Sequence, residues 1–261
     1  MTAVIESLTD TWTLVGTVRR RAMASPDGVA MRAKRLGIWR GITWADYADH
    51  VDLVGHALLS LGIEAGDRVA IHSENRPEWL FADLGTNAVR GITVGLYPTN
   101  PATEVAYLLA DSGARILIAE DQEQIDKALL VESQCPTLEH IIYLDPRGVA
   151  TIDNPKLMGW EDFLDRGRAH RETDPRALEH LAHEAKPTDI VTLVYTSGTT
   201  GPPKGAMLSN ANVEFASGVI VDGGGLYDPP PNPGDVILSY LPLCHVAERA
   251  VTTWTNAVSG A

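Results

Sequence analysis

Residues 195–205 read Tyr-Thr-Ser-Gly-Thr-Thr-Gly-Pro-Pro-Lys-Gly and directly follow an apolar run at residues 190–195. Glycines allow backbone N–H groups to close around an anion, hydroxyl groups add side-chain donors, and a lysine adds a full positive charge. A second apolar run at residues 205–209 precedes a helix start near Ser209 or Asn210. This order predicts a strand, a phosphate-binding loop and a second strand.

The P-loop of nucleoside triphosphatases is the nearest alternative for this stretch. That motif places Ser or Thr directly after its lysine, at the start of a helix. Here Lys204 follows Pro202 and Pro203, and Gly205 stands where the hydroxyl residue would be. Because proline has no N–H group to donate to a phosphate, a helix N-terminus does not form this site. An ordinary surface turn is the second alternative, and the ordered run of hydroxyls, glycines and a lysine disfavours it.

Residues 195–205 resemble the signature loop of the adenylate-forming enzymes, a family of acyl-CoA synthetases, luciferases and adenylation domains of peptide synthetases. Residues 240–249, Tyr-Leu-Pro-Leu-Cys-His-Val-Ala-Glu-Arg, resemble the next motif of that family in the form seen in long-chain fatty acyl-CoA synthetases. Further similar segments lie at residues 66–70, 75–79, 96–99 and 111–113. The resemblance therefore covers the chain from about Thr13 onward.

This resemblance implies that ATP activates a fatty acid as an acyl adenylate, and that the acyl group then passes to CoA. It implies that His245 is the catalytic residue beside the reacting carboxylate; a structural histidine at a strand end is the alternative. Mg²⁺ is expected to neutralise the phosphates through ligands that lie mostly beyond residue 261, and no metal ligand is assigned within the chain. The residues expected to hold the β- and γ-phosphates are Thr196, Ser197, Gly198, Thr199, Thr200, Gly201 and Lys204.

Three interpretations of the whole chain stay open. In the first, it is the N-terminal portion of a long-chain fatty acid–CoA ligase and is inactive by itself. In the second, it is a short, non-catalytic protein that binds nucleotide or regulates a partner. In the third, it belongs to a fatty acyl-AMP ligase that delivers the acyl group to a carrier protein. The acyl chain length and the oligomeric state are not indicated by the sequence.

The composition bounds the class of protein and its partners. Apolar residues make up 44% of the chain and charged residues 21%, which is typical of a soluble globular protein. A formal charge of −13 disfavours nucleic acid as a partner. The basic run Arg19–Arg21 ends a short helical pattern, so we expect a solvated helix end there, with peripheral membrane contact as the alternative.

The two cysteines, Cys135 and Cys244, make no disulfide framework, which fits a reducing cytoplasm. Cys244 adjoins His245, but neighbouring side chains on an extended segment point apart. We therefore expect Cys244 to be a small packed residue and not a nucleophile. Glu248 and Arg249 follow one helical turn later and are expected to form a local ion pair or to line an acyl tunnel, with a structural role favoured.

Apolar runs alternate with helical patterns through most of the chain. Because the runs lack a polar face, they predict a parallel sheet covered by helices on both sides. The resulting fold class is α/β, with layered parallel sheets flanked by helices; the family resemblance implies that it is the truncated large N-terminal domain of the acyl-CoA synthetase-like fold. Strands are expected at residues 68–72, 92–97, 115–119, 141–144, 190–195, 205–209 and 235–240. Helices are expected from Thr43 to Gly62 and at residues 77–89, 101–111, 122–131, 160–168 and from 246 onward.

We expect two subdomains. Residues 1–188 would form a first α/β subdomain with N-terminal helices, and residues 171–189 would link it to the next unit. Residues 189–261 would begin a second α/β subdomain that carries the phosphate loop and is incomplete. Residues 222–234 are rich in glycine and proline and predict an irregular loop. The small C-terminal domain of the family would be absent.

Overall fold

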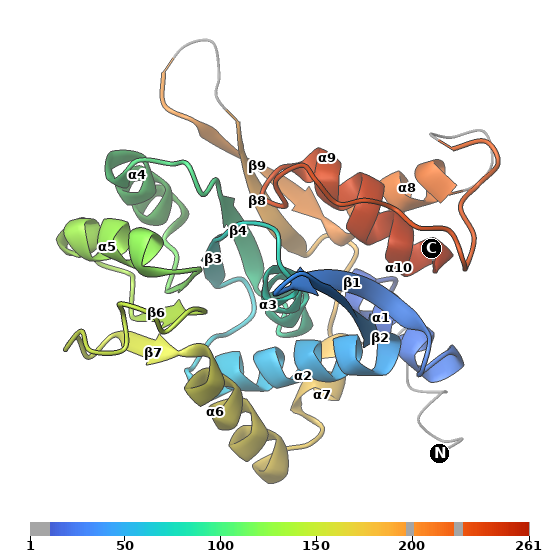
Figure 1. The fold of residues 1–261 in the computed structure, drawn as a ribbon, viewed down its shortest axis with the longest axis horizontal. Coiled ribbons are helices and arrows are strands. Elements are labelled where there is room, and N and C mark those ends of the chain that lie inside the picture. Colours follow the sequence, from blue (N-terminus) through green and yellow to red (C-terminus); the bar gives the residue numbers. More distant parts are fainter. Residues whose placement is uncertain (1–10, 197–200, 222–226, 261) are drawn as a thin grey trace.

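The computed structural model describes residues 11–196, 201–221 and 227–260. In these residues the main element is a sheet of seven strands in the order β7-β6-β5-β3-β4-β8-β9 (Figure 1). All neighbouring pairs are parallel except β8 and β9, which are antiparallel. The predicted parallel sheet is confirmed, with one antiparallel strand added at its edge. The strands span Arg68–His72 (β3), Ile92–Leu96 (β4), Ile116–Ala119 (β5), His140–Tyr143 (β6), Leu157–Gly159 (β7), Ile190–Thr196 (β8) and Lys204–Ser209 (β9).

Helices cover both faces of this sheet, as the apolar strands require. Val69 and Ile71 of β3 pack in one core with α1, α2, α3, α6 and α7, whereas Ala70 packs in a second core with α4 and α5. Figure 1 shows α4 and α5 set apart from α2 and α6. The helices span Leu14–Ala24 (α1), Trp44–Ser60 (α2), Pro77–Ala88 (α3), Ala102–Ser112 (α4), Gln122–Val131 (α5), Trp160–Thr173 (α6) and Ala177–His183 (α7).

Local sequence signals explain where these helices begin and end. Thr43 and Asp46 form a capping box at the start of α2, in which each side chain accepts the other residue's backbone N–H. Asp121 caps α5 by accepting the backbone N–H groups of Glu123 and Gln124. Gly113 ends α4 in the left-handed conformation, with φ of 62°. The predicted helix starts and stops are therefore confirmed in this part of the chain.

A two-stranded antiparallel hairpin precedes α2 and was not predicted. It consists of β1 (Val29–Arg35) and β2 (Ile38–Thr43). Its turn residues Leu36 and Gly37 both have positive φ, 49° and 80°. Such a turn is usually announced by Asn-Gly or Asp-Gly. Because leucine occupies the first position here, this turn could not be recognised from the residue types alone.

The C-terminal residues pack against the helices of the first core. This part contains α8 (Asn210–Val221), α9 (Val246–Glu248), a π-helical turn at Arg249–Trp254 and α10 (Thr255–Ser259). The predicted helix from residue 246 is therefore confirmed, with a π-helical turn inside it. Ser209 caps α8, since its Oγ accepts the N–H of Asn212 at 3.4 Å.

The strand predicted at residues 235–240 is wrong. In the described part of the chain, this segment joins no sheet and makes only an isolated bridge between Pro233 and Asp235. A strand needs the backbone of a neighbouring strand as its hydrogen-bond partner. Here the Leu241 carbonyl, just beyond the segment, accepts a hydrogen bond from the Asn75 side chain instead. Its alternate apolar side chains are consequently exposed: Val236 by 77%, Leu238 by 68% and Tyr240 by 74%.

The basic run at the end of α1 is only partly solvated, which corrects the prediction. Arg19 donates to the Asp52 carboxylate on α2, with Nε 3.0 Å from Oδ1. Arg21 donates to the backbone carbonyls of Ala257 and Val258 at the end of α10. Partial burial lowers the pKa of the Arg21 guanidinium from its ordinary value. The first helix is therefore tied to the second and to the last.

The expected boundary between residues 188 and 189 lies just before β8. This strand continues the same sheet, pairing with β4 through Thr192 and Leu193. The division into two subdomains stays a prediction. Of the helices that the structure describes, none has the length and apolarity needed to cross a bilayer.

Candidate functional site

The phosphate-loop candidate lies at the far end of the β8–β9 hairpin. After Leu193, β8 no longer pairs with β4 and has only β9 beside it, so the hairpin extends beyond the rest of the sheet (Figure 1). Opposite Tyr195, Gly205 leaves room for an aromatic ring, since a Cβ at this position would lie 3.2 Å from the ring. The sequence predicted this strand–loop–strand arrangement, and its two strands are confirmed.

Two helix α4 side chains support the hairpin. The Tyr107 hydroxyl donates to the Pro203 carbonyl at 2.9 Å. The Tyr195 hydroxyl donates to the Asp111 carboxylate at 2.7 Å. Burial and the nearby Asp111 charge raise the pKa of Tyr195 above its ordinary value, so the phenol keeps its proton. Sequence reasoning missed these two α4 residues, although their spacing of four places them on one face of the helix.

The structure places two of the predicted phosphate-binding residues side by side. Thr196 ends β8 and is the register partner of Lys204, which begins β9; both are exposed. Gly201 has φ of 90°, and none of the described atoms lies within 4 Å of the position a Cβ would take. The phosphate-binding role of these residues stays a prediction. The other four predicted residues, Ser197, Gly198, Thr199 and Thr200, lie outside the described residues.

His245 is exposed and directly precedes α9. Its Nδ1 accepts the backbone N–H of Ala247 at 3.1 Å. Because one ring nitrogen of neutral histidine is an acceptor and the other carries the proton, this hydrogen bond places the proton on Nε2. The neutral side chain would therefore present an N–H donor to its surroundings; its role at a carboxylate stays a prediction.

Cys244 fixes the place of His245 against the sheet. The side chain of Cys244 is buried, and a Cβ added at Gly95 of β4 would lie only 2.9 Å from its Cα and Cβ. Burial raises the pKa of the Cys244 thiol to about 12, so it is protonated at neutral pH. The prediction of a packed residue is confirmed.

Arg249 joins three elements beneath the hairpin. It is 1% exposed, and its Nη1 lies 3.3 Å from the Asp83 carboxylate of α3. Its Nη2 donates to the Thr192 hydroxyl of β8 at 2.8 Å. The guanidinium also lies over the Trp79 ring, 5.5 Å from the centroid. The predicted structural role is confirmed, but the ion pair is made with Asp83 and not with Glu248.

The described residues offer no metal site of their own. Within residues 11–196, 201–221 and 227–260, no group of three or more His, Cys, Asp and Glu side chains is placed to hold a metal ion. The donors at the hairpin are a hydroxyl, a lysine and backbone groups, which suit an anion and not a cation. These residues therefore fit the phosphates of a nucleotide, while no described residue is assigned to Mg²⁺.

Comparison with known protein families identifies the family of this chain. Residues 18–261 match the family described as AMP-binding enzyme. The chain belongs to this family. The family assignment made from residues 195–205 and 240–249 is thus confirmed.

Several individual proteins of this family are similar to the chain in sequence or in structure. The chain is 32% identical over 235 residues to the long-chain-fatty-acid–CoA ligase ACSBG2 of Xenopus laevis, covering 90% of this chain and 31% of that protein. It resembles the acetoacetyl-CoA synthetase structure from Streptomyces lividans with a TM-score of 0.73 and 21% identity, covering 95% of this chain and 38% of that one. It also resembles the structure of the anthranilate CoA ligase AuaEII in complex with anthranoyl-AMP, with a TM-score of 0.67 and 25% identity. That match covers 80% of this chain and 37% of that one. The chain spans about a third of the length of the curated relatives it matches.

Proposed function

We propose that this chain takes part in the ATP-dependent activation of a long-chain fatty acid. A carboxylate oxygen of the fatty acid attacks the α-phosphorus of ATP, forming an acyl adenylate and breaking the bond to pyrophosphate. The sulfur of CoA then attacks the acyl carbon, and AMP leaves. The open hairpin end with Thr196, Lys204 and Gly201 carries the proposal, because it concentrates phosphate donors in a chain of charge −13. Support also comes from the long-chain ligases among the relatives.

The proposed roles follow from the chemistry of each group. The hydroxyls of Thr196, Ser197, Thr199 and Thr200 donate to the β- and γ-phosphates, Gly198 and Gly201 let the backbone approach, and Lys204 neutralises charge. Such displacement reactions depend mainly on positioning and on stabilising charge. The Nε2–H of His245 donates to the reacting carboxylate or to the adenylate. Mg²⁺, when bound, supplies further neutralisation of the phosphates.

ATP binding by the 261-residue chain tests the phosphate role directly. Lys204→Ala should weaken binding of a fluorescent ATP analogue by about tenfold or more, since a hydrogen bond to a charged group contributes about 1.5–3 kcal/mol. Lys34→Ala is the matched control, because Lys34 is also an exposed lysine in a two-stranded hairpin. Equal affinities of the Lys204→Ala variant and the unchanged chain would refute the phosphate site.

The reaction itself is tested in the full-length protein as encoded. Fatty-acid-dependent release of pyrophosphate from ATP is expected, followed by CoA-dependent release of AMP. ATP binding without pyrophosphate release would favour the non-catalytic alternative. Pyrophosphate release that needs a carrier protein in place of CoA would favour the acyl-AMP ligase alternative.

A further inference from the structure

The loop that follows β3, residues 73–76, connects two parts of the molecule. Strand β3 lies between β4 and β5, and the helices after β3 and β5 cover opposite faces of the sheet. The sheet therefore has a switch point between β3 and β5, the place where ligands of open α/β sheets usually bind. Residues 73–76 begin at that switch point. The segment that leads to His245 lies against their other side.

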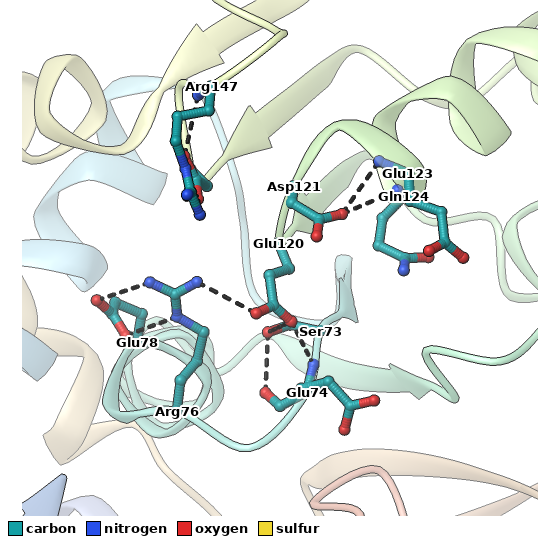
Figure 2. Close-up of polar contacts among 10 residues, drawn as sticks. Ser73, Glu74, Arg76, Glu78, Glu120, Asp121, Glu123, Gln124 and Arg147 are labelled. Atoms are coloured by element: carbon teal, nitrogen blue, oxygen red, sulfur yellow. Dashed lines mark hydrogen bonds and ion pairs between the residues drawn. The ribbon is translucent and has the colours of Figure 1, made fainter. Parts of the chain in front are cut away.

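At the switch point, Glu120 at the end of β5 holds the loop (Figure 2). Its Oε2 accepts the backbone N–H of Glu74 at 2.7 Å and the Ser73 hydroxyl at 3.2 Å. Its Oε1 lies 3.5 Å from Nη1 of Arg76. Arg76 also makes a two-pronged hydrogen bond to Glu78, at 2.8 and 3.2 Å. Figure 2 shows Glu120 between Arg76 and Ser73, so the carboxylate holds the start and the end of the loop together.

On the opposite side, Asn75 holds the segment before His245. Its two Nδ2 hydrogens go to the Ser239 hydroxyl at 3.0 Å and the Leu241 carbonyl at 2.7 Å. Its Oδ1 accepts the backbone N–H of Leu243 at 2.9 Å. Both donors and the acceptor of this one amide are therefore used on residues 239–243.

These contacts lead directly to the imidazole. The backbone N–H of His245 donates to the Pro242 carbonyl at 2.8 Å, which makes a tight turn between the residues that Asn75 holds and the histidine. The hydrogen bond from the Ala247 N–H to Nδ1 then sets the ring tautomer. Loss of the Asn75 bonds would remove two of the contacts that hold this turn, although the Leu241 N–H would still donate to Glu248 at 3.2 Å. A misplacement of about 1 Å at a reacting group costs about a hundredfold in rate.

We propose that Asn75 is the positioning residue for His245, fixed in turn by Glu120 and Arg76. Its effect on catalysis rests on the proposed function of His245, whereas its effect on the geometry of His245 does not. Asn75 reaches neither Thr196 nor Lys204, so ATP binding should be independent of it. The two consequences can therefore be measured separately.

The geometric consequence is tested by NMR on the 261-residue chain. At a pH that keeps histidine neutral, long-range proton–nitrogen spectra should show His245 as the Nε2–H tautomer. Asn75→Ala should shift this signal toward a mixture of tautomers. Asn75→Asp, which keeps the acceptor for Leu243 but loses both donors, should give a smaller change. An unchanged His245 signal in both variants overturns the proposal.

Asn154→Ala is the matched control for this experiment. Asn154 is also a half-buried loop residue that donates through Nδ2, to Glu132 at 3.0 Å, and accepts through Oδ1, from the Lys156 N–H at 2.9 Å. Its hydrogen bonds do not reach the His245 segment. Asn154→Ala should leave the His245 signal unchanged; an equal shift in this control would show a general structural effect and overturn the proposal.

The catalytic consequence is tested by kinetics of the full-length protein. Asn75→Ala should lower kcat for pyrophosphate release by about 10- to 100-fold and leave the KM for ATP within about twofold. Asn75→Asp should recover part of the loss. If Asn75→Ala alters the His245 signal but leaves kcat unchanged, the positioning stands and the proposed role of His245 is wrong. A rise in KM for ATP with constant kcat overturns the proposal.

Discussion

The carboxyl edge of this sheet holds polar groups in two contrasting ways. At the carboxyl ends of β3 and β5, the Glu120 carboxylate accepts from Ser73 and Glu74 and pairs with Arg76. At the end of the β8–β9 hairpin, Lys204 makes no ion pair with any residue the structure describes, and no described atom lies within 4 Å of the position that a Cβ on Gly201 would take. Ligands of doubly wound sheets usually bind where two such strands end. Here the polar groups at the ends of β3 and β5 bond to one another, so we expect them to serve as a scaffold and the hairpin end to be the binding region.

Removing the carboxylate of Asp83 should produce the largest loss of stability, because Asp83 pairs with Arg249, which holds β8 of the hairpin through Thr192. Asp83→Ala leaves the buried Arg249 cation without its partner, which costs about 3–5 kcal/mol of unfolding free energy. Urea unfolding measures the loss. Asp49→Ala, which breaks the exposed pair with Arg171, should cost less than about 1 kcal/mol. Similar losses in both variants would show that Arg249 does not anchor the hairpin.

The second largest effect is expected from acid, which should lower the free energy of unfolding through His72 at the end of β3. His72 ends β3 and is fully buried, and burial lowers its pKa from 6.5 to about 4. The pKa of His72 is therefore lower in the folded protein than in the unfolded chain. The stability that depends on a neutral His72 is fully present above pH 6.5 and is lost as the pH falls toward about 4. The loss amounts to about 3 kcal/mol.

Comparison of variants isolates this histidine from the other titrating groups. In His72→Gln, the fall in unfolding free energy between pH 7 and pH 4 should be smaller than in the unchanged protein. His180→Gln, which alters an exposed histidine, should keep the original pH dependence. A pH dependence that is identical in all three proteins would exclude a buried, neutral His72 in the folded protein.

The smallest expected losses of stability come from a direct comparison of the loop after β3 with the end of the β8–β9 hairpin. Glu120→Ala removes two hydrogen bonds and an ion pair from a side chain that is 25% exposed, so a loss of about 1–2 kcal/mol is expected after allowance for solvent screening. Lys204→Ala should change the unfolding free energy by less than about 0.5 kcal/mol. Thermal and urea unfolding measure both. A larger loss from the Lys204 variant would reverse the assignment of scaffold and binding region.

Much of the fold could be predicted because it depends on local patterns. The apolar run around Ile71 specifies a buried strand whatever follows it, and Thr43 with Asp46 specifies a helix start within four residues. The hairpin strands could also be predicted from the loop that joins them. These features need no knowledge of distant parts of the chain.

The rest depends on contacts between residues far apart in the sequence. Asn75 and Leu243 meet across 168 positions, and Arg249 and Asp83 across 166. Nothing near Asn75 indicates that its amide would be used on residues 239–243. The expected strand at residues 235–240 failed for the same reason: alternation predicts which side chains share a face, but not whether a neighbouring strand exists.

Gly95 has a consequence for any redesign of this protein. Its missing side chain lets the Cys244 backbone rest directly on β4, where an alanine would come within 2.9 Å of two Cys244 atoms. The height of the imidazole above the sheet is therefore set by the absence of a single methyl group. A larger residue 95 should therefore push the turn at residues 242–245 away from β4, and a series of side chains of increasing size would move the imidazole outward in steps.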